Sequence, residues 1–110
     1  MYQGETITTE IHCLPVPVSE IRSLLIIFKN YSRVLLEKTM DDCRVRTESV
    51  EGTEEVREII SCRLTQEETL AFPPGPIERS VIVVTRDGSR FELDPCAIQC
   101  GATAKKEVVT

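Results

Sequence analysis

A chain of 110 residues, 41% of them hydrophobic, can bury one core and has the size of one domain. Acidic residues outnumber basic ones by 18 to 13, and the longest basic run is Lys105-Lys106. Nucleic-acid binding needs a basic surface, so we expect no nucleic-acid partner. No segment approaches the roughly 20 apolar residues of a membrane span, and we expect no membrane contact.

The first half of the chain predicts paired strands. Residues 6–14 alternate between apolar and polar positions until Pro15, which lacks a ladder N–H, ends the strand. Its expected buried face carries Ile7, Thr9, Ile11 and Cys13. Residues 21–29 are rich in Leu and Ile and predict a central strand, and residues 34–39 return as its hairpin partner.

The middle of the chain predicts a second hairpin and one helical turn. Alternation from Cys43 indicates a half-buried strand, and the polar residues 51–55 form its loop. Ile60, Cys62 and Leu64 are expected to face the core. Residues 65–68 read Thr-Gln-Glu-Glu, a capping-box pattern with room for one or two helical turns before Pro73.

The last third predicts a long hairpin. Residues 77–85 form the longest β-branched run and predict a core strand, followed by a two-residue turn at Asp87-Gly88 with positive φ at both positions. Phe91 and Leu93 are then expected to face inward. Residues 94–101 fit either a strand or a helical turn, because Asp-Pro and a later glycine also bracket helices.

These elements predict an all-β fold: an immunoglobulin-like antiparallel β-sandwich of about seven strands with one short helical turn. Residues 1–102 form the single sandwich domain. Residues 103–110 have little to bury, and we expect them to form a flexible C-terminal tail.

Five cysteines and one histidine are the sharpest candidates for chemistry. A zinc site would draw on His12, Cys13, Cys43, Cys62, Cys96 and Cys100. No C-x-x-C pair occurs, and in a strand Cys96 and Cys100 lie about 13 Å apart. The other three cysteines fall on apolar strand faces, where cysteine behaves as a small hydrophobe. We therefore expect structural thiols, with no metal and no cofactor.

No pattern indicates catalysis. His12 and Cys13 are strand neighbours and point to opposite faces, so they cannot form a nucleophile–base pair, and His12 is expected at the surface. The chain has no phosphate-binding glycine loop, no G-x-S-x-G and no H-E-x-x-H, and its loop carboxylates lack calcium-loop spacing. We expect neither catalytic, cofactor-binding nor metal-ligating residues, and no enzyme activity.

A resemblance adds a functional expectation. Residues 63–93 contain Leu-Thr-Gln-Glu-Glu-Thr-Leu before a Pro-Gly turn and a strand that ends in Asp-Gly. This stretch resembles the immunoglobulin-like domains of phage tail and baseplate proteins, in particular the N-terminal domain of baseplate upper proteins from phages of Firmicutes. Residues 24–29 and 35–38 fit as the strand pair of that pattern.

The resemblance implies a non-catalytic structural or assembly protein of a phage or prophage. It would reside in the bacterial cytoplasm before assembly and in the virion tail afterwards. Its partners would be other phage structural proteins and copies of itself, bound through sheet edges and loops. We expect contacts at residues 73–76, residues 51–55 and the C-terminal tail.

Two other hypotheses stay open. The first is a metal-binding or redox-responsive protein built on the cysteines. The second is a generic peptide- or saccharide-binding module, which requires an exposed apolar or aromatic patch. The chain holds only five aromatic residues, two Tyr and three Phe. The N-terminus has no signal-peptide pattern, so we expect the reducing cytosol, where cysteines stay as thiols.

Overall fold

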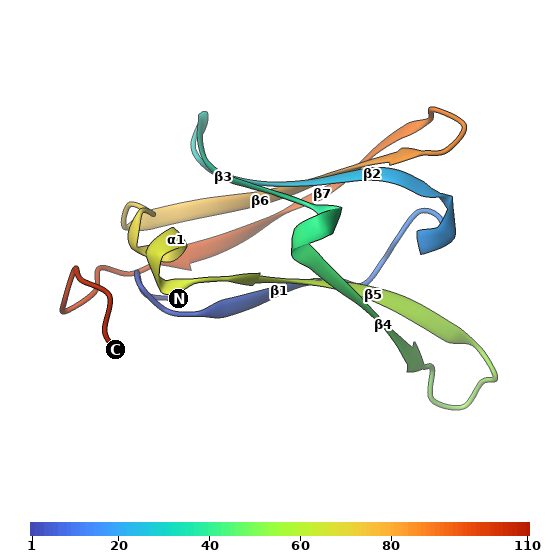
Figure 1. Ribbon diagram of the computed structural model, residues 1–110, viewed down its shortest axis with the longest axis horizontal. Coiled ribbons are helices and arrows are strands. Elements are labelled where there is room, and N and C mark those ends of the chain that lie inside the picture. The colour runs from blue at the N-terminus through green and yellow to red at the C-terminus, as the bar shows by residue number, and fades with distance from the viewer.

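A computed structural model describes all 110 residues and shows two antiparallel sheets that face each other (Figure 1). The three-stranded sheet has the order β1-β5-β4, and the four-stranded sheet has the order β3-β2-β6-β7. The strands are β1 (Ile7–Ile11), β2 (Ile21–Asn30), β3 (Arg33–Thr39), β4 (Cys43–Ser49), β5 (Val56–Leu64), β6 (Gly75–Thr85) and β7 (Arg90–Cys100). The helical segments are η1 (Val18–Glu20), η2 (Met40–Asp42) and α1 (Gln66–Leu70). The predicted all-β sandwich of seven strands with one short helix is confirmed.

The position of β2 defines the topology. The sheet orders β1-β5-β4 and β3-β2-β6-β7 correspond to the immunoglobulin orders B-E-D and C′-C-F-G, so only the first immunoglobulin strand, A, has no counterpart. The strand β2 accordingly lies in the four-stranded sheet, between β3 and β6. The segment with Pro15 and Pro17 therefore carries the chain from one sheet to the other, and η1 leads directly into β2.

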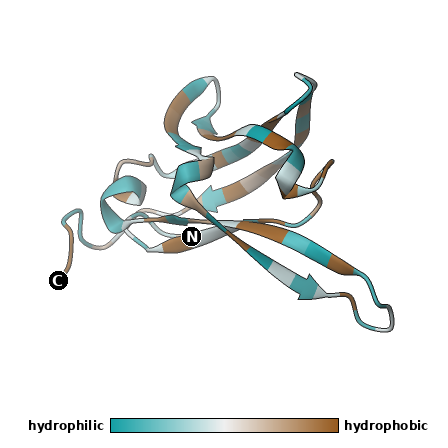
Figure 2. Cartoon of the chain, turned by 45° about the vertical axis from the view of Figure 1, so that its right-hand side comes forward, coloured by the Kyte–Doolittle hydropathy of each residue, from teal (hydrophilic) through white to brown (hydrophobic).

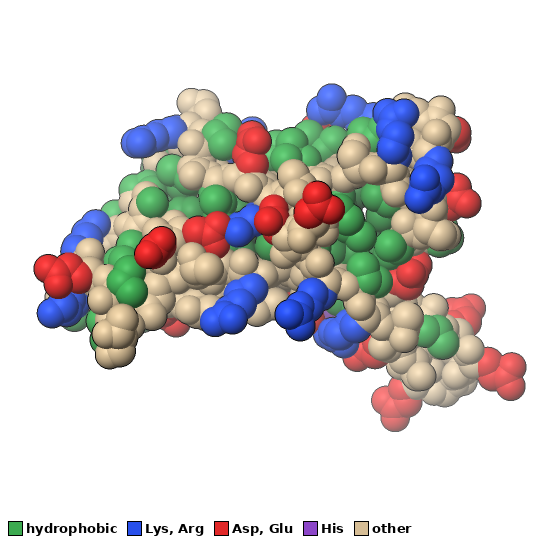
Figure 3. Space-filling view, in the orientation of Figure 1, with side chains coloured by type: hydrophobic (Ala, Val, Ile, Leu, Met, Phe, Trp, Pro, Cys, Tyr) green, Lys and Arg blue, Asp and Glu red, His purple; other side chains and the backbone are tan.

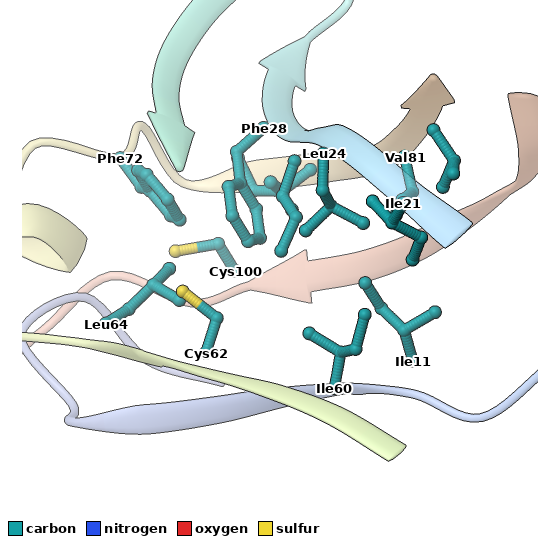
Figure 4. Close-up of a cluster of buried hydrophobic side chains, with 13 residues drawn as sticks. Ile11, Ile21, Leu24, Phe28, Ile60, Cys62, Leu64, Phe72, Val81 and Cys100 are labelled. Atoms are coloured by element: carbon teal, nitrogen blue, oxygen red, sulfur yellow. The ribbon is translucent and has the colours of Figure 1, made fainter. Parts of the chain in front are cut away.

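Side chains from both inner faces form the core. Hydropathy alternates along most strands, as Figure 2 shows, and most of the buried residues lie on β1, β2, β5 and β6. Figure 4 shows the two layers meeting between the sheets. The rings of Phe28 and Phe72 lie 5.8 Å apart between centroids. The core cluster is Ile11, Ile21, Leu24, Ile26, Phe28, Ile60, Cys62, Leu64, Phe72, Ile77, Val81, Val83 and Cys100.

The helix α1 begins at the predicted capping box. The Thr65 hydroxyl accepts a hydrogen bond from the Glu68 N–H at 3.3 Å, and the Glu68 carboxylate accepts one from the Thr65 N–H at 2.9 Å. The buried Thr69 hydroxyl then donates to the Glu5 carbonyl at 2.8 Å. These bonds fix α1 to the segment that precedes β1.

The β6–β7 turn differs from the prediction. The Gly88 N–H donates to the Thr85 carbonyl at 3.0 Å, and within the turn only Gly88 has a positive φ, of 90°. The connection is therefore a three-residue loop, a tight turn followed by a left-handed glycine. The Asp87 carboxylate accepts from the Thr85 hydroxyl and the Ser89 N–H, which stabilises this longer loop.

Residues 94–101 adopt the strand alternative. Arg79 pairs with Cys96 and Val81 pairs with Leu93, so two residues of β7 lie opposite Ser80. This bulge accommodates Pro95, which has no N–H to donate. The helical-turn alternative is wrong.

Two predicted core positions are also wrong. Cys13 is exposed because β1 ends at Ile11 and the chain leaves the sheet before reaching it. Phe91 is 40% exposed because β7 is the edge strand of its sheet.

The molecule is elongated. Its radius of gyration is 15.4 Å, against about 13 Å for a compact chain of this length. The β4–β5 hairpin projects beyond the two layers, and the two ends of the chain lie together at the opposite end (Figure 1). Tyr2 bridges to Gly101, and the Gln3 N–H donates to the Gly101 carbonyl at 3.0 Å.

The C-terminal residues lie against α1. The Gln66 side-chain amide donates to the Val109 carbonyl and accepts from the Val109 N–H, both at 3.0 Å. The Thr103 N–H donates to the Gln3 side chain at 3.2 Å. The flexibility of residues 103–110 stays a prediction.

Candidate interaction surfaces

The five thiols are spread over the fold. Cys62 and Cys100 are buried, Cys43 is half-buried, and Cys13 and Cys96 are exposed. No three His, Cys, Asp or Glu side chains lie close enough together to hold a metal ion. The six residues considered for a zinc site therefore do not converge.

Cys43 and Cys62 lie directly opposite each other on β4 and β5. Burial and the neighbouring Cys62 thiol raise the pKa of the Cys43 thiol to about 12. Burial also raises the pKa of Cys62 and of Cys100. These three thiols are protonated at neutral pH, which makes them weak nucleophiles and weak metal ligands.

His12 belongs to a surface network, in keeping with the expected exposed position. Its Nε2 lies 3.4 Å from a Glu10 oxygen, and the other Glu10 oxygen accepts from Arg46 at 2.6 Å. That hydrogen bond holds the pKa of Glu10 below its usual value. Glu10 and Arg46 lie on strands either side of β5, so their ion pair bridges β5 near the fully buried Ile59.

The four-stranded sheet has an apolar outer face. Its two central strands point Leu25, Ile27, Ile82 and Val84 away from the core, and we call these four residues the outer face. All four are half-buried and none belongs to the core or packs against it. Figure 3 shows apolar side chains gathered along this side of the molecule.

Polar residues surround the outer face on the neighbouring strands. On β3, Thr39 lies opposite Leu25 and Glu37 lies opposite Ile27. On β7, Glu92 lies opposite Ile82 and Arg90 lies opposite Val84. An apolar centre with a polar rim is the usual anatomy of a protein–protein interface.

The sequence contains a signal for the outer face, but this signal can be interpreted only once the fold is known. Residues 24–28 and 81–84 are uninterrupted apolar runs, a pattern typical of strands covered on both faces. In this sandwich only their inner face is covered by the chain itself. The second apolar face is left without a partner.

A cleft separates β1 from β7 at one side of the sandwich. It has a volume of about 490 Å³, and its lining includes Glu10, Arg79, Glu92 and Asp94. Arg79 was missed by the sequence reading, because an arginine within a β-branched strand gives no sign that it crosses to the other sheet. Its Nη1 donates to the Thr9 hydroxyl at 2.6 Å and to the Glu10 carbonyl at 3.1 Å, both on β1.

The loops expected to make contacts lie at opposite ends. Residues 51–55 form the exposed tip of the projecting β4–β5 hairpin, where acidic side chains are visible in Figure 3. Residues 73–76 follow α1 at the other end and lead into β6. The contact roles of these loops stay predictions.

Comparison with protein-family models, with curated proteins and with solved structures found no match to this chain. None of its helices has the length and apolar character needed to cross a membrane.

Proposed function

We propose that this chain is a non-catalytic structural protein of a phage or prophage, of tail or baseplate type. It acts in assembly by binding other structural subunits, including copies of itself, through the outer face. It resides in the bacterial cytoplasm before assembly and in the virion afterwards. The resemblance of residues 63–93 to phage tail and baseplate domains supports the class of protein.

The outer face carries the proposal. A central strand with apolar side chains on both faces is expected to be covered on both faces. The chain supplies a core on one side and leaves Leu25, Ile27, Ile82 and Val84 partly exposed on the other. Covering them with a partner would remove further apolar surface from water, which favours association by about 25 cal/mol for each Å².

The shape of the molecule adds support. Only 18 of the 110 residues are buried, and the radius of gyration exceeds that of a compact chain. A thin sandwich with a projecting hairpin keeps a large surface for contacts relative to its core. Subunits of an assembly gain the rest of their burial from neighbours.

Sedimentation velocity on the purified chain at tens of micromolar tests the proposal. We expect association that Ile27→Glu weakens at least about tenfold, because the new carboxylate would have to be desolvated. Thr8→Glu is the matched control. It places the same charge on the outer side of β1, opposite Arg63, and should leave association unchanged.

Two outcomes would contradict the proposal. The first is a chain that stays monomeric and also fails to bind structural proteins encoded beside it. The second is equal weakening by both variants, since the effect would then come from net charge. Circular dichroism should show that both variants keep the strand content of the parent chain.

A further inference from the structure

The three-stranded sheet has no strand that covers the inner face of β7. One sheet has four strands and the other has three, and the cleft between β1 and β7 lies where a fourth strand would fit. Leu93 on the inner face of β7 is only half-buried, while Phe91 and Cys96 are exposed. The open edge of β1 leaves backbone groups without a strand partner.

Arg79 marks this gap with an unpaired donor. Its side chain leaves β6 and reaches across to β1, where Nη1 is bound. Its Nε is buried and has no hydrogen-bond acceptor. Buried donors without an acceptor are rare in folded proteins, so this atom indicates a missing acceptor inside the cleft. The backbone carbonyl of an added strand would supply one.

The charges of the cleft favour a basic segment. Three carboxylates line it, those of Glu10, Glu92 and Asp94, against the basic side chains of His12 and Arg79. Glu10 already pairs with Arg46 and Glu92 with Arg90, whereas Asp94 has no ion-pair partner in its own chain. The one basic cluster of the chain, Lys105-Lys106, lies in the C-terminal residues. The same segment carries Val108 and Val109, which are 42% and 60% exposed and have high strand propensity.

We propose that the cleft between β1 and β7 binds residues 102–110 of a second copy of this chain as an added strand along β1. The lysines lie against the cleft carboxylates, a valine covers the inner face of β7, and a backbone carbonyl accepts from Arg79 Nε. Cleft and tail are different surfaces, so the contact is head-to-tail and joins copies into a ring or a filament.

The tail can leave its own chain at little cost. There it makes hydrogen bonds to the side chains of Gln66 and Gln3, and the two bonds to Gln66 are exposed. Lys105 pairs only with Glu107 of the same segment, at 3.8 Å. Exposed pairs and hydrogen bonds of this kind contribute little to stability.

A labelled peptide of residues 102–110, titrated against the full-length chain and followed by fluorescence anisotropy, tests the proposal. We expect saturable binding that Glu92→Lys with Asp94→Lys weakens about fivefold, as expected for two exposed ion pairs. Both side chains are exposed, so the doubly substituted chain should fold normally. A peptide with Lys105→Glu and Lys106→Glu should restore the ion pairs with reversed signs. It should therefore bind the doubly substituted chain as tightly as the unsubstituted peptide binds the unsubstituted chain.

The absence of saturable binding, or failure of the charge-swapped pair to restore it, would overturn the proposal. Two further chains locate the site. Ile27→Glu alters the outer face and Gln66→Ala removes the two hydrogen bonds between Gln66 and the tail, and both chains should bind the peptide undiminished. Weaker binding by either chain would assign the peptide to that other surface. The Ile27→Glu result also separates this proposal from the outer-face assembly, because each can fail without the other.

Discussion

Lys38 occupies an inward-facing position of β3, directly opposite the buried Ile26. Its ammonium lies 2.5 Å from the Glu68 carboxylate of α1, with side chains 13% and 21% exposed. Burial is the largest single influence and lowers the pKa of Lys38, but the hydrogen bond that Lys38 donates to Glu68 and the nearby negative charges together outweigh it, so the net pKa is raised. Burial likewise opposes ionisation of Glu68, yet Lys38 and the Thr65 N–H hold its pKa below 4.5.

These two shifts set the pH range of the ion pair. The lowered pKa of Glu68 gives stability that is present above its unfolded pKa and is lost as pH falls through the folded one. The raised pKa of Lys38 gives stability that is present below its unfolded pKa and is lost as pH rises through the folded one. The pair therefore stabilises the fold throughout the neutral range.

Replacing Glu68 by Gln should remove the ion pair and keep the helix cap, because Gln also serves at this capping position. We expect a loss of about 1 kcal/mol in the free energy of unfolding at pH 7. We also expect the variant to lose less stability as the pH falls through the acid range in which the wild-type carboxylate, with its lowered pKa, becomes protonated. Urea unfolding across this range measures both, and an unchanged acid decline would contradict the assignment to Glu68.

At the scale of single elements the sequence was a good guide. Alternation and β-branched runs located all seven strands, and Thr-x-x-Glu located the start of α1, since these signals are local. The geometry of the β6–β7 turn could not be predicted from the sequence. Asp87-Gly88 suits a two-residue turn as well as a three-residue one, and hydrogen bonds from Thr85 and Ser89 to Asp87 select the longer loop.

The geometry of the β6–β7 loop predicts how substitutions of Gly88 affect stability. Gly88→Ala should cost about 1 to 2 kcal/mol, because an L side chain at a φ of 90° is strained although no atom lies within 4 Å of the added carbon. Gly88→Asn is the matched control and should cost less, since Asn tolerates left-handed conformations. Equal losses for the two variants in chemical denaturation would contradict this loop geometry.

At the scale of the whole molecule, pairing between distant residues limited what the sequence could predict. It predicted a two-layer sandwich, but nothing local places β2 beside β6. The buried Ile59 was missed for the same reason, because it lies opposite Arg46 of β4, and the ion pair of Arg46 with Glu10 of β1 forms only in the assembled sheet. The outer face and the β1–β7 cleft likewise exist only once both sheets are assembled.

The two-layer core predicts very different roles for two phenylalanines. Phe28→Ala should cost about 3 to 5 kcal/mol, because it empties a fully buried site against Phe72. Phe91→Ala on the edge strand should cost less than about 1 kcal/mol in the isolated chain. Thermal and urea unfolding of both variants measure the contrast, and comparable losses would mean that Phe91 belongs to the core.

The bridge between Tyr2 and Gly101 has a consequence for how the protein forms in the cell. It joins residues 99 positions apart, and β7 adds the last strand to its sheet. Loop closure over such a distance is slow, and it cannot begin before Gly101 has been synthesised. Until Gly101 leaves the ribosome, the edge of β6 that pairs with β7 and the segment before β1 lack their final neighbours. The sandwich can therefore close only after residue 101 has been synthesised, and until then β6 presents an unpaired edge at which the nascent chain can associate wrongly.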